Sequence, residues 1–293
     1  MLTRRQAIKT TLGALGGASG AAALYAYFVE PHWVRVHQRT LPIDGLPKHL
    51  EGRTLVQLSD LHVGPDVDSR YLMRALDRAG ALEPDVVVVT GDWITYRTPA
   101  ELDELARVLE HAPRGRLGSV GILGNHDYGP GWRNVEIANA VAKVAEGAGI
   151  RVLRNEAATI AGLQVIGLAD LWSPQFGPAE LLATHGADPA TLVLCHNPDG
   201  ADRPVWGGYR GWILAGHTHG GQCKPPFLPP PMLPVENRRY TAGEIPLADG
   251  RRLYINRGLG HWLHVRFNVR PEITRFTLRR GPVAAEPATK GTS

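Results

Sequence analysis

Five short motifs along this chain carry side chains that bind divalent metal ions. They are, in order, Asp60-Leu61-His62, Gly91-Asp92, Gly124-Asn125-His126-Asp127, Cys195-His196 and Gly216-His217-Thr218-His219. Each follows an apolar run, where a loop leaving a strand can aim side chains into a shared cleft. No single motif is specific, because a lone Gly-Asp is usually a turn and a lone histidine on an apolar strand is usually packed in the core. The ordered set predicts a two-metal hydrolytic site.

The donor types restrict the metal and the reaction. Carboxylate, amide oxygen and imidazole suit Mn²⁺, Fe or Zn²⁺, and a chain with only two cysteines lacks the thiolate cluster of a structural zinc site. Two carboxylates against two divalent ions leave excess positive charge, which attracts a phosphate. Such ions, ~3.5 to 4 Å apart, lower the pKa of a bridging water and produce hydroxide near neutral pH. The predicted chemistry is in-line attack of this hydroxide on phosphorus.

The elements that must position these motifs follow an α/β pattern. Short apolar runs alternate with helical stretches over 54–58, 68–81, 86–89, 100–111 and 120–123. The spacing from Asp60 to Asp92, and from Asp92 to Asn125, is close to the ~30 residues of one βαβ unit. We therefore expect the ligands at successive strand ends.

The second half of the chain is richer in strands. After a helical stretch over 135–148, apolar runs suited to strands occupy 157–160, 163–168, 191–194, 211–214, 253–255 and 273–278. These runs predict a second sheet facing the first.

The motifs resemble those of the calcineurin-like metallophosphoesterases, over roughly residues 50–260. Three segments resemble the bacterial exported branch of the YkuE and YaeI type: Cys-His-Asn-Pro-Asp at 195–199, Gly-His-Thr-His-Gly-Gly-Gln at 216–222 and Asn-Arg-Gly-Leu-Gly at 256–260. The resemblance implies an α/β fold, a four-layer αββα sandwich of two facing mixed sheets flanked by helices.

The resemblance also implies a role for each candidate residue. One ion would be bound by Asp60, His62 and His219, the other by Asn125, His196 and His217, with Asp92 bridging both. His126 would stabilise the transition state and, if protonated, donate a proton to the leaving oxygen. Asp127 either raises the pKa of His126 or fixes its loop.

Two positions at which this chain differs from related enzymes restrict the class of substrate. Phosphoprotein phosphatases of this superfamily carry a second Asp three residues after the bridging Asp and a Glu after the loop His, where this chain has Thr95 and Asp127. A protein phosphatase is therefore disfavoured. With the resemblance to the exported branch, we predict a phosphodiesterase acting on a lipid or envelope-derived phosphoester. A nucleotide or sugar-nucleotide pyrophosphatase is the alternative. A non-catalytic metal-binding envelope protein is disfavoured, because a closed structural site has no use for an extra acid such as His126.

A proline-rich segment, 224–234, begins just after the histidine pair and must leave the rim of the site. It is apolar, stiff and unable to form a regular helix. Two interpretations stay open: the rim rests on a bilayer, or Phe227 and Leu233 pack inward over the core. Trp93, Trp172 and Trp262 either line the cleft or pack as isolated aromatics, and packing is favoured.

The first thirty residues resemble a twin-arginine export signal. The stretch Thr3-Arg4-Arg5-Gln6-Ala7-Ile8-Lys9 precedes an uncharged run over 10–29. The most apolar part follows the small-residue cleavage site at 21–23, and this order favours an uncleaved anchor. We predict a signal or anchor over 1–30, a catalytic domain over 31–280 and a flexible tail over 281–293.

An export signal determines which partners, which cellular location and which metal ion we expect for this chain. We predict the twin-arginine export machinery and the membrane as partners, at the extracytoplasmic face, or in the periplasm or cell wall if the segment is cleaved. Export of a folded protein lets Mn²⁺ or Fe be inserted before Cu²⁺ and Zn²⁺, the stronger binders, compete. Mn²⁺ is therefore the favoured ion.

Charge and cysteine usage exclude other classes. The net charge is +4, but Arg4, Arg5 and Lys9 belong to the signal, so the remaining domain is only weakly basic and not typical of a nucleic-acid binder. Five late arginines are expected on solvated strand faces: Arg266, Arg270, Arg275, Arg279 and Arg280. Cys195 and Cys223 are too few for a disulfide framework, and inert thiols are favoured over a bond.

Overall fold

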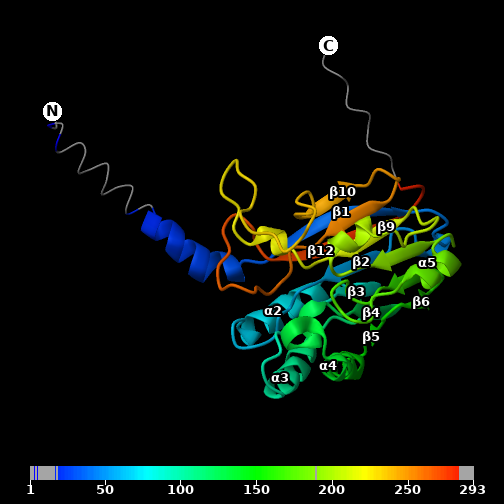
Figure 1. Ribbon diagram of the computed structural model, residues 1–293, viewed down its shortest axis with the longest axis horizontal. Helices are drawn as coiled ribbons and strands as arrows, with labels where there is room; N and C mark the ends of the chain where they lie inside the picture. The colour runs from blue at the N-terminus through cyan, green and yellow to red at the C-terminus, as the bar shows by residue number, and fades with distance from the viewer. Residues whose placement is uncertain (1–2, 4, 6–16, 18, 189, 284–293) are drawn as a thin grey trace, which may run out of the picture.

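The structure, a computed structural model, describes residues 3, 5, 17, 19–188 and 190–283 (Figure 1). Half of the predicted export signal, including Arg4 and the run over 6–16, lies outside the described residues, as does the predicted tail from residue 284 onward, so the predicted domain limits stay predictions. Among the described residues, none of the helices has both the length and the apolar character needed to cross a membrane.

The first sheet holds the predicted βαβ units. Its strand order is β1 (Arg35–Ile43), β12 (Glu272–Arg280), β2 (Thr54–Leu58), β3 (Val86–Thr90), β4 (Gly118–Ile122) and β5 (Arg151–Val152). Strands β2 to β5 are parallel, whereas β12 runs antiparallel to β2 and parallel to β1. The carboxyl ends of β2, β3 and β4 therefore meet at one edge.

Three helices cover the outer face of this sheet: α2 (Ser69–Gly80), α3 (Ala100–Leu109) and α4 (Val135–Gly147). The side chain of Asp68 caps α2 by accepting from Arg70 N, and Asn134 caps α4 by accepting from Glu136 N and Ile137 N. Their apolar faces pack against buried valines of the sheet, among them Val56, Val87 and Val89.

The second sheet has the order β10 (Gly243–Pro246), β11 (Arg252–Ile255), β9 (Trp212–Ala215), β8 (Thr191–Leu194), β7 (Leu163–Gly167) and β6 (Glu156–Ile160). The parallel strands β7, β8, β9 and β11 form its centre, and β6 and β10 are antiparallel edges. Helix α5 (Ala179–His185) follows β7 along the chain.

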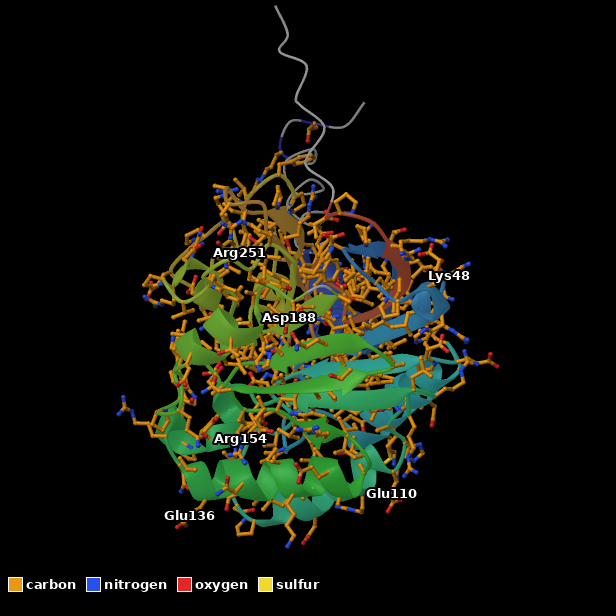
Figure 2. All side chains as sticks on the ribbon, turned by 90° about the vertical axis from the view of Figure 1, so that its right-hand side faces the viewer. Lys48, Glu110, Glu136, Arg154, Asp188 and Arg251 are labelled. Atoms are coloured by element: carbon orange, nitrogen blue, oxygen red, sulfur yellow. The ribbon has the colours of Figure 1, made fainter. Side chains whose placement is uncertain are left out.

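A shared core confirms the four-layer αββα sandwich. Leu55 and Val88 of the first sheet belong to the same buried cluster as Leu192 and Leu214 of the second. Side chains fill the space between the layers, while charged groups such as Glu110 and Glu136 lie on the outer surface (Figure 2). The two facing mixed sheets were predicted, but the membership of one strand was not. The run over 273–278, expected in the second sheet, forms β12 and belongs to the first.

The N-terminal segment is fastened to the catalytic body. A π-helical turn, Tyr25–Val29, and a 3₁₀ turn, Glu30–His32, lead into β1. The buried carboxylate of Glu30 accepts hydrogen bonds from Asn268 N at 2.9 Å and Val269 N at 2.5 Å. The helix ending at this turn therefore leaves the body at a defined place (Figure 1).

Candidate metal centre

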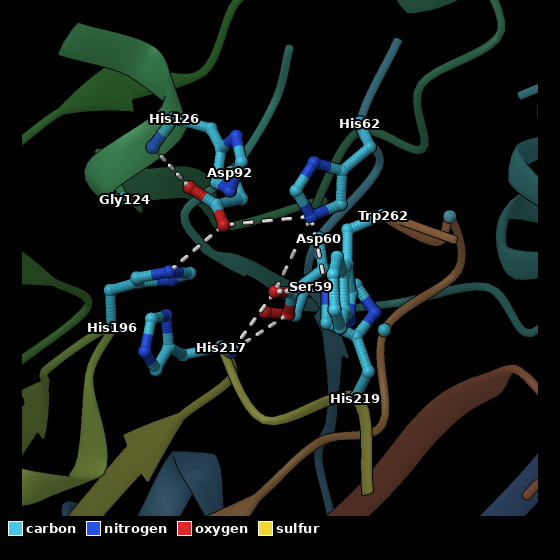
Figure 3. Close-up of polar contacts among 12 residues, drawn as sticks. Ser59, Asp60, His62, Asp92, Gly124, His126, His196, His217, His219 and Trp262 are labelled. Atoms are coloured by element: carbon cyan, nitrogen blue, oxygen red, sulfur yellow. Dashed lines mark hydrogen bonds and ion pairs between the residues drawn. The ribbon is translucent and has the colours of Figure 1, made fainter. Parts of the chain in front are cut away.

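The predicted ligands converge at the carboxyl ends of five strands (Figure 3). Asp60 and His62 follow β2, Asp92 follows β3, Asn125 follows β4, His196 follows β8, and His217 and His219 follow β9. All seven side chains are buried. Residues 157 positions apart, such as His62 and His219, are thus brought into contact because the parallel strands of both sheets end at the same edge.

One cluster consists of Asp60, His62 and His219. His219 Nε2 lies 3.3 Å from Asp60 Oδ1, and His62 Nε2 lies 3.0 Å from His219 Nε2. These are the separations of donor atoms that share one cation bound at ~2.0 to 2.2 Å. The opposite nitrogen of His62 lies 2.9 Å from Thr95 Oγ1, so Thr95 fixes the orientation of the ring.

A second cluster consists of Asp92, His196 and His217. Asn125 directly precedes His126, whose backbone N donates to Asp92 Oδ1 at 2.9 Å. Asp92 Oδ2 lies 3.2 Å from His196 Nε2 and 3.5 Å from His62 Nε2, a ring of the first cluster. The carboxylate of Asp92 thus stands between the clusters, as a bridging ligand must.

Unpaired buried atoms show that this donor set fits cations. Within the described residues Asp92 Oδ2, Asn125 Oδ1 and His196 Nε2 are buried without a hydrogen-bond partner. Such atoms are rare in folded proteins unless a ligand satisfies them. His196 Nδ1 donates to Thr90 O at 2.7 Å and His217 Nε2 to Pro234 O at 2.9 Å. A carbonyl only accepts, so the neutral ring of His217 keeps its lone pair on Nδ1. Although burial lowers the pKa of His196, the charge of Asp92 holds that pKa well above the usual range, and a bound cation would replace the proton on His196 Nε2.

The charge state of the cluster fits the binding of divalent cations. Burial holds the pKa values of His62 and His219 well below the usual range and lowers the pKa of His217 to about 3, so these rings are neutral donors. Burial also raises the pKa of Asp60 to about 7, although His196 nearby lowers it. A divalent cation would keep this buried carboxylate ionised.

The ligand backbones adopt an uncommon conformation. Five ligands have positive φ: Asp60 (51°), His62 (49°), Asp92 (53°), His217 (71°) and His219 (50°). Non-glycine residues seldom occupy this left-handed region, and such strain concentrates at functional sites. The adjacent glycines permit the close approach, because a Cβ on Gly124 would lie 2.3 Å from Asp92 Oδ1.

Asp127 holds the loops of the centre together. Its Oδ1 accepts from Trp93 N at 2.8 Å and Ile94 N at 3.2 Å, and its Oδ2 accepts from Asp92 N at 3.0 Å and Gly124 N at 2.8 Å. Asp127 makes no hydrogen bond to the ring of His126. The alternative that Asp127 fixes the loop is therefore the one the geometry supports.

Replacing Asp127 by Asn is expected to lower the free energy of unfolding by about 3 kcal/mol, because the amide group faces two buried N–H donors that then lack an acceptor. Urea unfolding of the metal-free protein measures this loss. Asp103→Asn, an exposed change in α3, serves as the control and should stay within about 0.5 kcal/mol of the parent. Equal stability of the two variants would contradict the structural role.

His126 lies beside both clusters without using its ring. Its backbone N donates to Asp92 Oδ1 at 2.9 Å, and its ring packs edge-on to His62 at 4.8 Å between centroids. Within the described residues this ring makes no hydrogen bond, which leaves it available to a substrate oxygen. A nitrogen of His126 also lies within 4.8 Å of ligand atoms of His62 and Asp92, so metal content is the measurement that separates an acid from a further ligand.

Arg266 was wrongly expected on a solvated strand face. It is fully buried in a loop, and burial lowers its pKa to about 10. Its guanidinium donates to Gly260 O at 2.5 Å and Arg257 O at 2.9 Å and lies 3.4 Å from His219 Nδ1. It therefore supports the loop behind a ligand, like Thr95 behind His62. The sequence carries no local signal for either contact.

The tryptophans singled out in the sequence have different roles: Trp93 packs in the core, whereas Trp172 lies beside the second cluster. Trp93 is buried and donates from Nε1 to Ile122 O, as expected of a packing residue. Trp172 lies 4.6 Å from the ring of His217 and stacks on Trp132 at 4.8 Å. The stacked pair forms an aromatic wall beside the second cluster, and Trp132 was not among the candidates from the sequence.

The exposure of the proline-rich segment excludes the interpretation that it packs inward, whereas the interpretation that the rim rests on a bilayer stays a prediction. Phe227 is fully exposed, so the interpretation that it packs inward is wrong, whereas Leu233 is half-buried. Cys195 and Cys223 are free thiols. Cys195 is buried and donates to Asn197 O at 3.3 Å, as an inert thiol does.

Comparisons with known proteins agree with this geometry. A family model described as calcineurin-like phosphoesterase matches residues 53–221. Phosphodiesterase YaeI of Escherichia coli is 30% identical and covers 95% of this chain and 100% of its own. The uncharacterized metallophosphoesterase YkuE of Bacillus subtilis is 32% identical, covering 95% and 98%. UDP-2,3-diacylglucosamine pyrophosphatase LpxG of Chlamydia trachomatis is 27% identical, covering 85% and 91%.

Among solved structures, a dimetal phosphatase from Danio rerio is similar at a TM-score of 0.46 and 11% identity, covering 71% of this chain and 88% of that one. This similarity is too low to carry an argument about function.

Proposed function

Because the chain belongs to the calcineurin-like phosphoesterase family, and is therefore a metal-dependent phosphoester hydrolase, we propose that it is a phosphodiesterase acting on a lipid or envelope-derived phosphoester. The observation that carries the proposal is the pair of clusters joined through Asp92 Oδ2, with the unengaged ring of His126 beside them. A site that served stability alone would have no use for that ring.

The chain's own residues would divide the reaction as follows. Asp60, His62 and His219 would hold one divalent ion, Asn125, His196 and His217 would hold the other, and Asp92 would contribute to both. When bound, such a pair neutralises phosphate charge and lowers the pKa of water. His126 is placed to donate a proton to the leaving oxygen, and its position is set by the bond from its backbone N to Asp92.

Two relatives support the substrate class. The Escherichia coli relative is named a phosphodiesterase, and the Chlamydia relative is named for a lipid-linked pyrophosphate. Both names describe cleavage of a phosphorus centre that carries two substituents. The second relative also favours the alternative function, a sugar-nucleotide pyrophosphatase, for which the exposed side of the Trp132–Trp172 wall would offer a stacking surface.

The proposed location is the extracytoplasmic face of the membrane, or the periplasm or cell wall if the N-terminal segment is cleaved. The paired Arg4 and Arg5 ahead of an uncharged run over 10–29 support export through the twin-arginine machinery. Mn²⁺ is the proposed ion, because folding before export permits its insertion away from competing Zn²⁺.

The function is tested by diester and monoester hydrolysis. The full chain, stripped of metal and reconstituted with Mn²⁺, is expected to hydrolyse bis(p-nitrophenyl) phosphate faster than p-nitrophenyl phosphate. No turnover of either compound by protein that holds two ions per chain would contradict a general phosphodiesterase. Hydrolysis of UDP-sugars alone by the same preparation would select the pyrophosphatase.

The proposal that Mn²⁺ is the bound ion predicts how turnover depends on the metal that is added. Reconstitution with Mn²⁺ should give about tenfold or more higher diester turnover than Zn²⁺ at equal metal content, because a chain that receives Mn²⁺ before export is expected to have its site adapted to catalysis with that ion. Turnover is divided by the bound metal measured by emission spectrometry. Clearly higher turnover with Zn²⁺ would exclude the Mn²⁺ assignment.

A further inference from the structure

Exposed apolar side chains from three segments lie on one side of the molecule, and we call them the rim patch. The rim patch consists of Leu24, Tyr27, Phe28 and Val29 of the N-terminal helix, Phe227, Leu228 and Met232 of the proline-rich segment, and Trp262 and Leu263 of the loop after β11. Figure 1 shows the blue helix, the yellow loop and the orange loop together at one end of the body. Scattered exposed apolar residues need no explanation, but a contiguous group indicates a binding surface.

Backbone contacts join the three segments into one surface. Arg266 N donates to Ala26 O at 2.9 Å, which ties the loop after β11 to the helix. Lys224 N donates to Phe267 O at 2.9 Å, which ties the proline-rich segment to the same loop. The ring of Tyr27 lies 4.5 Å from that of His264. The rim patch is therefore a continuous and fixed surface.

The rim patch borders the metal centre. Gln222 follows the ligand His219 by three residues, and its side chain donates to Leu263 O at 2.8 Å and accepts from Trp262 N at 3.0 Å. Gly260 N donates to Asp60 O at 2.7 Å, so the loop that carries Trp262 is attached directly to a ligand motif. A surface or molecule bound to the rim patch would therefore lie next to the metal centre.

Phe227 gives the strongest evidence that the rim patch serves binding. Its side chain is 104% exposed, and its backbone has a φ of 65°, a strained conformation for a bulky residue. The side chain therefore gains nothing from folding, and an asparagine or glycine would fit the backbone better. Strain of this kind is retained at sites that serve binding.

The chain outside the described residues indicates what covers the rim patch. The uncharged run over 10–29 ends at Tyr25–Val29, within the rim patch, so the segment proposed to reach the membrane leaves the body there. At its edge Arg35, Arg257 and Arg270, together with Glu30, line a cavity of about 190 Å³. Arg257 pairs with Glu272 at 3.1 Å and Arg270 stacks on Trp33, so the exposed Arg35 is the cationic group best placed for an anionic headgroup. Apolar side chains bordered by cationic groups are typical of proteins that lie on a bilayer.

We propose that the rim patch docks on a lipid bilayer, so that the metal centre faces the headgroup layer. The proposal rests on the membrane location given under the proposed function. It goes further in naming a second contact, because the body itself, and not only the N-terminal segment, touches the lipid. A phosphoester in the headgroup layer would then reach the centre without leaving the bilayer.

A nitroxide probe on the rim patch tests docking separately from anchoring. The full chain carrying Cys223→Ser receives a label at Phe227→Cys, and in a matched protein at Leu117→Cys. Leu117 is also exposed and apolar, but it precedes β4 at the sheet edge opposite Asn125. Vesicles of phosphatidylcholine with phosphatidylglycerol are added, and collisions with oxygen and with a water-soluble nickel complex are compared.

Docking predicts that the probe at position 227 gains oxygen collisions and loses nickel collisions on vesicles, while the probe at position 117 stays aqueous. A probe at position 227 that stays aqueous on vesicle-bound protein would overturn the proposal and assign the rim patch to a protein partner. A probe at Leu228→Cys should gain fewer oxygen collisions on vesicles when Phe227→Asn is added, because the body loses an apolar contact while the N-terminal segment still holds the chain. The thermal midpoint of Phe227→Asn should be unchanged or higher, because asparagine suits the backbone; an undiminished gain at position 228 would also overturn the proposal.

Diester turnover in solution, measured on the parent protein, separates this proposal from the proposed function. If the protein turns over diesters but does not dock on vesicles, only the docking proposal is refuted and the proposed function stands. Docking without turnover on any phosphoester supports the rim patch and refutes the proposed function.

Discussion

Replacing Asp92 by asparagine is expected to lower diester turnover by ~10³-fold or more and to remove one of two bound ions. Asp92 Oδ2 lies 3.2 Å from His196 Nε2 and 3.5 Å from His62 Nε2, so this oxygen is the shared donor of both clusters. Asparagine keeps the shape of the side chain and an oxygen for His126 N, but it removes the negative charge that a pair of divalent ions requires. Asp92→Asn therefore tests the negative charge of this side chain while its shape is kept.

Turnover of bis(p-nitrophenyl) phosphate and bound metal per chain are the two measurements. Asp85→Asn is the matched control, because Asp85 is equally buried yet lies before β3, at the far edge of the sheet, where it accepts from Thr54 N at 2.8 Å. That control should lose stability while it keeps two ions and its turnover. Two retained ions and near-normal turnover in Asp92→Asn would show that Asp92 is not the bridge.

The convergence of the candidate ligands was predictable from the sequence because each motif combines a local signal with a regular position. The strand β2 was predicted over its full range, Thr54–Leu58, and β3 to within one residue. Once parallel strands are recognised, their carboxyl ends must share an edge, so the loops after them meet. The left-handed backbones of Asp60, His62 and Asp92 were not predictable, since they depend on the packing of several loops.

The strands that were missed or misplaced lack such a local signal. Strand β1 lies at a sheet edge and carries Arg35, His37 and Arg39, so it has no apolar alternation to detect. Strand β12 was detected, but its apolar pattern suits either sheet. Its place beside β1 and β2 follows from the path of the chain and not from its own residues.

Supporting residues were the least predictable part of the site. Arg266 binds the carbonyl groups of Arg257 and Gly260, and a backbone carbonyl gives no signal in the sequence. Thr95 was noted only as a departure from phosphoprotein phosphatases, yet it lies 2.9 Å from His62 Nδ1. Contacts of this kind follow from tertiary structure, whereas ligand types follow from the chemistry of the ion.

Replacing His126 by alanine is expected to lower turnover by ~10²-fold while two ions stay bound, because the change removes a proton donor and leaves the seven ligands in place. Metal content and diester turnover measure the two effects. His111→Ala, an exposed histidine after α3, is the control and should change neither. Loss of an ion in His126→Ala would instead make His126 a ligand, a role that its distance from His62 and Asp92 permits.

The leaving group decides whether the loss reflects proton donation. A p-nitrophenolate leaves without help, whereas a phenolate or alkoxide is more basic and needs a proton from the enzyme. The deficit of His126→Ala should therefore grow from bis(p-nitrophenyl) phosphate to diphenyl phosphate. If the deficit were equal for both diesters, His126 would act by stabilising charge on the phosphate and not as an acid. The unengaged ring beside Asp92 leads us to expect the unequal deficit.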